Sequence, residues 1–446
     1  MRHRLWKAWA ISGTWLFIAS AQADPAQKTS RTPEAAASAF HAAIDKAADA
    51  VLPKVVAWRR DFHEHPELGN SEVRTAKVVA DELKALGLEV KTGIARTGVV
   101  ALLRGGKPGP VVALRSDMDA LPVTEVGDLP FRSRVTATWA GQQTGVMHAC
   151  GHDLHMAMLL GTAHVLAGLK DQLAGSVKFI FQPAEEGPPP GEEGGASLMV
   201  KEGAMENPKV DAIFGLHVFP DEVGTIGWRA RGIMAQADTL RITVKGRQTH
   251  GAVPWGGVDP IVVSAQIVLG LQTLISRQAD LAKAPAVLTI GAINGGNRQN
   301  IIPEEVKMLG TLRTFDPQMR DDLLTRIRRT ISLIAQSAGA TADVTLGDGY
   351  PVTYNDPALT ARMDPTLRRI AGERSRPDVT PRTAAEDFSY FQREAPGLFL
   401  FLGVTPKGTP PEKVFENHSP YFFADEGALI TGVRVMSNLA VDYLMR

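Results

Sequence analysis

The sequence predicts an α/β protein: a catalytic domain with a mostly parallel sheet flanked by helices, plus an inserted α+β (βαββαβ) satellite domain. First, short apolar runs of buried-strand type alternate with segments of helical periodicity, which favours a parallel sheet covered on both faces. Second, the pattern changes near residue 236, where polar and apolar residues begin to alternate. Third, the length of 446 residues exceeds one ordinary domain.

Strand and helix signals place the main elements of the larger domain. Helical periodicity covers residues 76–86 and 155–169, and Gly87 stands where the first of these helices would end. The strand-like runs cover residues 98–103, 111–114, 177–181 and 212–218. The catalytic domain is expected over residues 38–235 and 348–446.

The smaller domain follows from the order of its segments. Residues 239–245 alternate polar and apolar side chains, which suits a sheet with one solvated face. After them come a helix, two strands, a helix and a strand, over residues 261–275, 286–293, 306–313, 321–338 and 342–346. This β-α-β-β-α-β order is a split βαβ unit, so residues 236–347 are expected to form the satellite domain.

The N-terminus has the three parts of a secretory signal peptide. A basic start is followed by an apolar stretch over residues 8–19 and a small-x-small site at residues 21–23. We expect residues 1–23 to be the signal peptide, residues 24–37 to be a flexible leader, and the protein to be exported, periplasmic or secreted. No second apolar run of spanning length is expected, and hence no membrane partner after cleavage.

Composition excludes several classes of protein. Lys+Arg and Asp+Glu each number 48, so the net charge is zero and no nucleic-acid partner is expected. With 44% hydrophobic and 22% charged residues, the chain is not disordered as a whole. Cys150 is the single cysteine, which rules out a disulfide within one chain.

Side chains able to bind a metal follow the predicted strands. They are Asp117 after the second strand, Cys150 and His152 before the helix at 155–169, Glu185 and Glu186 after the third strand, and His217 at the end of the fourth. Because ligands bind beyond the carboxyl ends of parallel strands, we expect one site. Imidazole, carboxylate and thiolate are donors for borderline divalent ions.

Each of these residues also has an ordinary structural explanation. A lone cysteine is often a small buried hydrophobe, a histidine can be satisfied in the core, and a Glu pair is commonly solvated. Cys150 lies among histidines in an exported chain, and the Glu pair follows an apolar strand, which favours the metal site. Adjacent side chains diverge, so one carboxylate can bind metal while the other acts as a base. The residues alone leave His418 unassigned, because it also fits a surface turn.

Taken together, the motifs resemble the M20 family of metallopeptidases, and within it the amidohydrolase branch of hippurate hydrolases, auxin-conjugate hydrolases and N-acyl amino acid deacylases. The matching stretches are residues 62–68, 115–122, 147–153, 181–187, 215–217, 300–303, 386–388 and 418–420. They run in the family's order from about residue 50 to the C-terminus.

The resemblance implies roles for these residues. The implied ligands of one or two divalent ions (Zn, Mn, Co or Ni) are Cys150, His152, Glu186, His217 and His418. Glu185 resembles the general base, and Asp117 stands at the family's His-x-Asp position. Arg115 replaces the histidine of many peptidase relatives, as is usual in this branch, which leaves open the group that bridges the metals. On the satellite domain, His250 resembles an oxyanion-stabilising residue and Asn300 a substrate-binding one.

The expected function is that of a metal-dependent amidohydrolase, which cleaves N-acyl amino acids of hippurate-like type by a metal-activated water with a Glu base. The first alternative is an M20-type exopeptidase, a carboxypeptidase or dipeptidase acting on short peptides. A remote alternative is a non-catalytic binding protein that retains the fold.

A homodimer is also expected. The helix at residues 261–275 is apolar over more than one side and needs burial beyond what a small sheet provides. The resemblance points the same way, because many relatives dimerise through the satellite domain. His250 would then act either within its own chain or across the interface.

Overall fold

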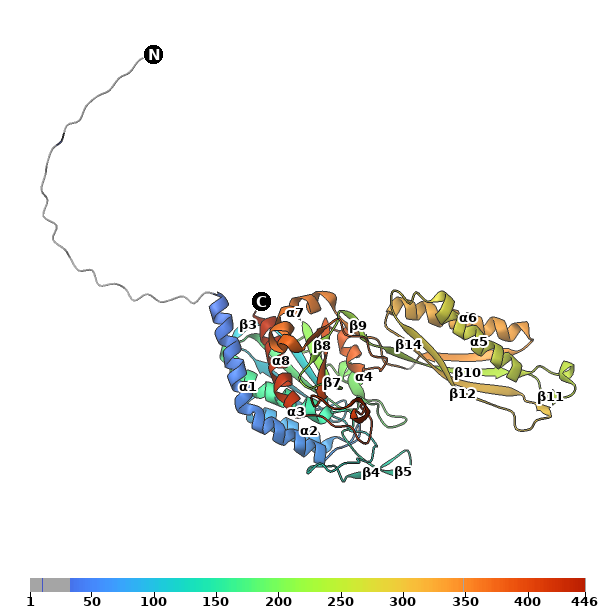
Figure 1. The fold of residues 1–446 in the computed structure, drawn as a ribbon, viewed down its shortest axis with the longest axis horizontal. Helices are drawn as coiled ribbons and strands as arrows, with labels where there is room; N and C mark the ends of the chain where they lie inside the picture. The colour runs from blue at the N-terminus through green and yellow to red at the C-terminus, as the bar shows by residue number, and fades with distance from the viewer. Residues whose placement is uncertain (1–9, 11–32, 348, 446) are drawn as a thin grey trace, which may run out of the picture. The chain divides into compact units, whose positions relative to one another are not determined.

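Two separate sheets organise the chain (Figure 1). The computed structural model describes Ala10 and residues 33–347 and 349–445. Apart from Ala10, the predicted signal peptide lies outside the described residues. Residues 24–32 of the predicted leader lie outside them too. Helix α1 spans Pro33–Glu64, so the last part of that leader is helical. Pro33 at the first turn and the alanines after it favour a helix there.

The larger sheet has eight strands in the order β1-β2-β6-β3-β7-β18-β8-β17. Their bounds are Glu89–Ile94 (β1), Gly98–Arg104 (β2), Lys107–Asp117 (β3), Ala174–Gln182 (β6), Ala212–Glu222 (β7), Ile226–Trp228 (β8), Ser375–Pro377 (β17) and Gly397–Thr405 (β18). The central strands β6, β3, β7 and β18 are parallel, which confirms the predicted sheet. Strands β1 and β2 add an antiparallel edge.

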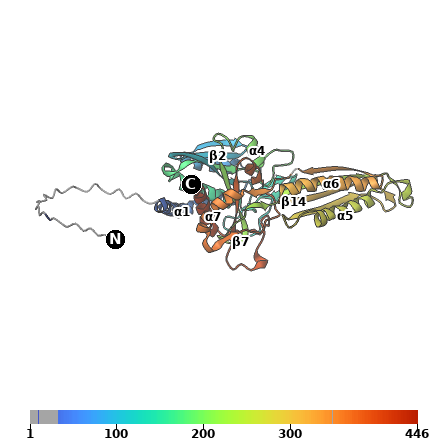
Figure 2. The same cartoon turned by 90° about the horizontal axis from the view of Figure 1, so that it is seen from above.

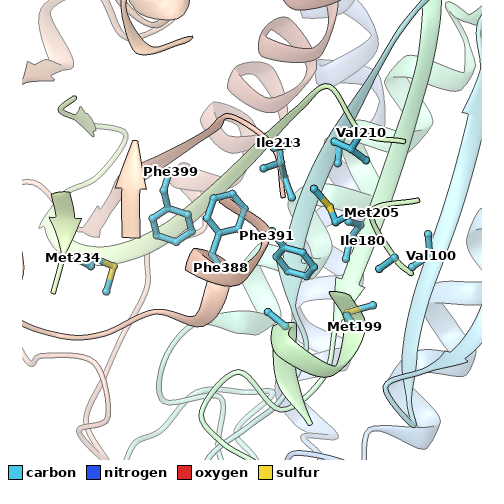
Figure 3. Close-up of a cluster of buried hydrophobic side chains, with 14 of the residues drawn as sticks. Val100, Ile180, Met199, Met205, Val210, Ile213, Met234, Phe388, Phe391 and Phe399 are labelled. Atoms are coloured by element: carbon cyan, nitrogen blue, oxygen red, sulfur yellow. The ribbon is translucent and has the colours of Figure 1, made fainter. Parts of the chain in front are cut away.

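Helices cover both faces of this sheet. They are α2 Val73–Ala85, α3 His152–Ala167, α4 Gly195–Lys201, α7 Pro357–Ala371 and α8 Gly427–Leu444, with the 3-10 segment η4 at Asp387–Arg393. Neighbouring residues of β7 point to opposite faces: Phe214 contacts Tyr443 of α8, whereas Ile213 belongs to the cluster that includes Phe388 and Phe399 (Figure 3). Both faces of the sheet are therefore buried.

The satellite sheet is antiparallel, in the order β12-β14-β10-β15. Its elements are β10 Gln236–Lys245, α5 Pro260–Gln278, β12 Ala286–Gly295, β14 Glu305–Thr314, α6 Pro317–Ser337 and β15 Thr341–Gly347. Both helices lie on one face (Figure 2). Asp259 and Asp316 cap them, each with a carboxylate that accepts from backbone N–H groups of the first turn.

Short elements complete the described chain. They are β4 Thr136–Trp139 with β5 Gln142–Gly145, β9 Arg231–Met234 with β16 Thr353–Asn355, β11 Thr249–His250 with β13 Ile301–Ile302, and the 3-10 segments Lys170–Gln172, Pro254–Gly256, Gly372–Arg374 and Pro411–Lys413.

Helix α5 corrects one expectation. Its 19 residues are long and apolar enough, by length and composition, to cross a membrane, although no further run of spanning length was expected. Val263, Ile267 and Leu271 of α5 are buried in the satellite core. One face of α5 is therefore buried as in a core helix, and its outer side carries additional apolar residues.

Candidate metal centre and active site

The ends of the parallel strands carry the candidate site. Asp117 is the last residue of β3 and pairs in register with Gln182, the last residue of β6. His217 lies on the next strand, β7. Cys150 precedes Gly151, which has φ 91° at the N-cap of α3. That left-handed conformation favours glycine and lets the chain turn directly from Cys150 into the helix.

The five predicted ligands form two groups that share one thiol. Cys150, His152 and His217 make the first group, and Cys150, Glu186 and His418 make the second, with donor atoms within 4.8 Å of one another. Cys150 Sγ lies 3.3 Å from Nε2 of both His217 and His418. Because it is common to both groups, Cys150 would be their shared donor if both held an ion.

Hydrogen bonds fix the tautomers of two of these histidines. His152 Nδ1 donates to the carbonyl oxygen of Asp119 at 2.8 Å, and His217 Nδ1 donates to that of Val218 at 2.7 Å. A carbonyl oxygen can only accept, so in the neutral form of each ring Nε2 carries the lone pair that a metal would use. In the described structure, His152 Nε2 is buried and has no hydrogen-bond partner, so this nitrogen is available to a cation.

The charges of the site also fit a cation. Burial, followed by Glu186 and Glu185, raises the pKa of the Cys150 thiol well above its usual value. Burial, followed by His155, lowers the pKa of His217 well below its usual value. A divalent cation between such groups favours the thiolate and needs a neutral imidazole. Thiolate, imidazole and carboxylate together suit Zn, Mn, Co or Ni.

Glu185 and Glu186 are adjacent but have different environments. Burial, and then Glu386 and Glu186, raise the pKa of Glu185 well above its usual value. Burial would also raise the pKa of Glu186, but its hydrogen bond with His418 and the charge of His152 lower it. His418 Nε2 lies 2.8 Å from Glu186 Oε1, whereas Glu185 Oε2 lies 4.0 Å from His152 Nε2. Glu186 therefore has the environment of a metal-binding carboxylate, and Glu185 that of a proton carrier.

The backbone before this pair is strained. Ala184 has φ 50°, in the left-handed region that a residue with a Cβ adopts at a cost of about 1 kcal/mol. This turn separates the end of β6 from Glu185 and directs the two carboxylates differently. Asp387 N–H donates to Glu185 Oε1 at 3.4 Å.

Asp117 lies behind the metal-binding residues. Its Oδ1 accepts from His155 Nδ1 at 2.6 Å, because His155 Nε2 already accepts from the Val218 N–H at 2.9 Å. Its Oδ2 accepts from Arg115 at 2.8 Å and lies 3.7 Å from His152 Nε2. Asp117 therefore contacts a metal-binding histidine while both of its oxygens are held by other side chains.

His250 and Asn300 lie together on the satellite domain. They line a shallow pocket with Gln248, Thr249, Arg298 and Ile301. His250 Nδ1 accepts from the Ala252 N–H at 3.0 Å, so its Nε2 is the donor. Neither residue lines the cavity onto which Cys150, Glu185 and Glu186 open.

Several residues of the site were missed by sequence reasoning. Asn417 donates to the carbonyl oxygens of Cys150 at 3.0 Å and Val218 at 3.2 Å, and it thereby holds the His418 loop against the site. Asp119 Oδ2 accepts from the Glu186 N–H at 3.0 Å. The only sequence signal for these residues is that they stand next to, or two positions from, a predicted site residue.

A cavity of about 840 Å³ opens onto these groups. Cys150, Glu185, Glu186, His217 and His418 line it on one side. Its other walls include Phe219, Met234, Val379, Arg382 and Phe401. Arg382 lies 4.0 Å over the ring of Phe219 and pairs with Asp221 at 2.9 Å. The cavity thus combines the donor groups at one end with mixed walls, in which the apolar Phe219, Met234 and Phe401 lie among charged side chains such as Arg382 and Asp221.

Metal-dependent amide hydrolysis uses a Lewis acid and a proton carrier side by side, and the side chains around this cavity can hold the first and supply the second. The protein is therefore a metal-dependent hydrolase of linear amide or peptide bonds. Residues 113–442 match the model of peptidase family M20/M25/M40, and the chain belongs to this family.

Three relatives illustrate the range of the family. Thermostable carboxypeptidase 2 of Saccharolobus solfataricus is 40% identical over 394 residues, 87% of this chain and 95% of that protein. N-acetyl-L-cysteine deacetylase of Bacillus subtilis is 36% identical over 84% of this chain and 85% of that protein. A solved structure, a dinuclear metal-binding M20 peptidase from Bacillus subtilis, has a TM-score of 0.74 and 35% identity, covering 89% of this chain and 99% of that one.

Proposed function

We propose that this enzyme cleaves the amide bond of N-acyl amino acids, hippurate-like conjugates among them. The observation that carries the proposal is the buried carboxylate of Glu185 beside the Cys150-centred donor groups, at one end of a cavity whose walls include Phe219, Met234 and Phe401. These apolar residues suit the apolar part of an acyl group. The similarity to an N-acetyl-L-cysteine deacetylase supports the same class of substrate.

The residues of the chain divide the chemistry between them. Divalent ions, when bound, supply Lewis-acid polarisation of the amide carbonyl and make water more acidic. Glu185 takes the proton from the attacking water and then delivers it to the departing nitrogen. A pKa raised above that of a free carboxylate makes it a stronger base for the first step. Asp119 holds both His152 and the Glu186 backbone in place.

The satellite residues complete the proposed site. His250 presents its Nε2–H for the oxyanion that develops in the transition state, and Asn300 binds the substrate carboxylate. His250 acts from its own chain or from the second chain of a homodimer.

Export is also part of the proposal. It rests on the basic start, the apolar stretch and the small-x-small site at the N-terminus. The protein would then work in the periplasm or outside the cell, with Asp24 as its first residue. Mass spectrometry of exported material tests this start, and an intact Met1 would contradict it.

A substrate screen tests the proposed function. Purified enzyme, reconstituted with Zn, Mn, Co or Ni, is assayed with hippurate, N-acetyl amino acids and dipeptides, with a chelator-treated sample as the control. We expect the highest kcat/KM on an N-acyl amino acid and no turnover without metal. Equal turnover in a verified metal-free sample would overturn the mechanism.

An exopeptidase acting on short peptides is the second candidate. The similarity to a carboxypeptidase over 95% of that protein favours it. The two activities use the same metal and base, so the same screen separates them. Preference for dipeptides over every N-acyl amino acid would select the exopeptidase.

A further inference from the structure

Two side chains outside the metal centre hold the strained turn that carries Glu185. The carboxylate of Glu72 accepts from the Ala184 N–H at 2.8 Å. The hydroxyl of Tyr350 donates to the carbonyl oxygen of Glu185 at 2.8 Å. One hydrogen bond thus fixes the peptide before Ala184 and the other fixes the peptide after Glu185. Between them lies the left-handed Ala184, with φ 50°.

The hydrogen bonds of the Glu72 carboxylate lead away from the helix that the residue precedes. It occupies the N-cap position of α2, but its side chain caps no backbone N–H group of that helix. The fully buried carboxylate extends instead to Ala184 and to the hydroxyl of Thr97, at 2.6 Å. Burial, and then the charge of Asp119, raise the pKa of Glu72 to about 8. A neutral amide is therefore a close replacement for this group near pH 7.

Tyr350 reaches the turn from the other side. It follows β15 in the sequence, and its own carbonyl oxygen accepts from the Ala237 N–H at 3.1 Å. Burial, and then the charge of Asp387, raise the pKa of Tyr350, so its hydroxyl keeps the proton that it donates. Neither Tyr350 nor Glu72 lines the main cavity.

We propose that Glu72 and Tyr350 are positioning residues, which hold the turn at residues 184–185 so that the Glu185 carboxylate stays aimed at the reacting groups. The inference rests on the proposed function, because it takes Glu185 as the base. A left-handed alanine relaxes when its restraints are removed, and the side chain that follows it then swings. A displacement of about 1 Å at a reacting group can lower the rate about 100-fold.

Tyr350→Phe is the central test, because it deletes one oxygen and leaves the packing of the ring. We expect kcat to fall about tenfold or more, with KM and metal content within about twofold of wild type. Tyr390→Phe is the matched control. Its ring lies 6.2 Å from that of Tyr350, and in the described chain its hydroxyl makes no hydrogen bond to residues 183–187. The control should retain wild-type kcat.

Variants of Glu72 provide the second part of the test. Glu72→Met removes the acceptor and should lower kcat as Tyr350→Phe does. Glu72→Gln keeps an oxygen for the Ala184 N–H and should restore most of the activity. Amide hydrogen exchange of the peptide that contains residues 180–190 should be faster in Glu72→Met than in Glu72→Gln. This readout needs no substrate.

The outcomes separate the two proposals. If wild type turns over no N-acyl substrate or peptide, the proposed function fails, while the exchange measurement still tests the restraint. If wild type is active and Tyr350→Phe keeps full kcat, the positioning role is overturned. A loss of metal content or melting temperature at unchanged kcat per folded molecule would also overturn it, because that pattern belongs to a purely structural contact.

Discussion

At the scale of single residues, the two adjacent glutamates show how surroundings assign roles. Glu186 pairs with His418, which lowers its pKa, whereas Glu185 lies beside Glu386, which raises the pKa of Glu185 along with burial. The lowered pKa favours the charged form of Glu186, which suits a metal, and the raised pKa favours the protonated form of Glu185. Identical side chains therefore acquire different properties because their neighbours differ.

We predict that Glu185→Gln loses turnover and keeps its metal. The amide cannot carry the proton, which typically costs about 10²–10⁴-fold in rate. Metal analysis and kcat on the best N-acyl substrate are the measurements. Glu186→Gln is the matched variant and should lose metal instead. The reverse pattern would mean that the two roles are exchanged.

A second prediction concerns Glu72 and pH. The pKa of Glu72 rises from 4.5 in the unfolded chain to about 8 in the folded one, so between these values only the folded state holds the proton. Its contribution to stability is complete below pH 4.5 and is lost as pH rises through 8. Between pH 4.5 and 8, the free energy of unfolding of wild type should fall by about 1.4 kcal/mol for each unit of rising pH, relative to that of Glu72→Gln.

Urea unfolding of both proteins in EDTA, at several pH values across this window, measures the difference without a contribution from bound metal. A difference in the free energy of unfolding that stays constant with pH would show that Glu72 titrates alike in the folded and unfolded states.

The sequence predicted the residues whose donor atoms the structure brings together and did not point to those proposed to position Glu185. Cys150, Glu186 and His217 could be found because they follow apolar strands whose ends must meet. Glu72 and Tyr350 act through single hydrogen bonds to a backbone turn. No periodicity or spacing marks such a contact, because it depends on how distant segments pack.

At the scale of elements, the start of α3 shows a similar limit. Helical periodicity suggested residues 155–169, whereas α3 spans His152–Ala167. The first turn of α3 is mostly polar, so the apolar periodicity gives no signal there. Gly151, at φ 91°, sets the true start and places His152 as the first helical residue beside Cys150. One backbone conformation therefore positions two metal-binding side chains.

We predict that Gly151→Ala lowers metal affinity about 10–100-fold, the range typical of residues that orient metal ligands. A Cβ at this position would lie 2.3 Å from Val218 Cγ2, so the loop that carries Cys150 must shift. Gly141→Ala is the control, with φ 80° and no atom within 4 Å of the added Cβ. Competition with a metal-binding dye measures both proteins. Wild-type affinity in Gly151→Ala would show that the loop tolerates the shift.

At the scale of the whole molecule, the satellite domain leaves apolar surface uncovered. Helix α5 buries one face in its own core, yet Leu269 is 70% exposed, and Ile261 and Val262 are about half exposed. The sequence predicted this helix and its apolar excess, but periodicity within one chain could not show what covers it. Exposed apolar residues gathered on one helix are typical of a surface that another chain buries.

We predict a homodimer that forms through this surface of α5. Sedimentation at micromolar concentration should give twice the chain mass, and Leu269→Glu should give the monomer, because a buried interface disfavours an unpaired carboxylate. Val73→Glu is the control, since Val73 is 68% exposed on α2 of the catalytic domain and its replacement should leave the dimer intact.

Mixing inactive Glu185→Gln with inactive His250→Ala then locates His250. Recovered activity means that His250 acts across subunits, and no recovery in a dimer that exchanges subunits places it in its own chain. A fully active monomeric wild type would remove the dimer altogether.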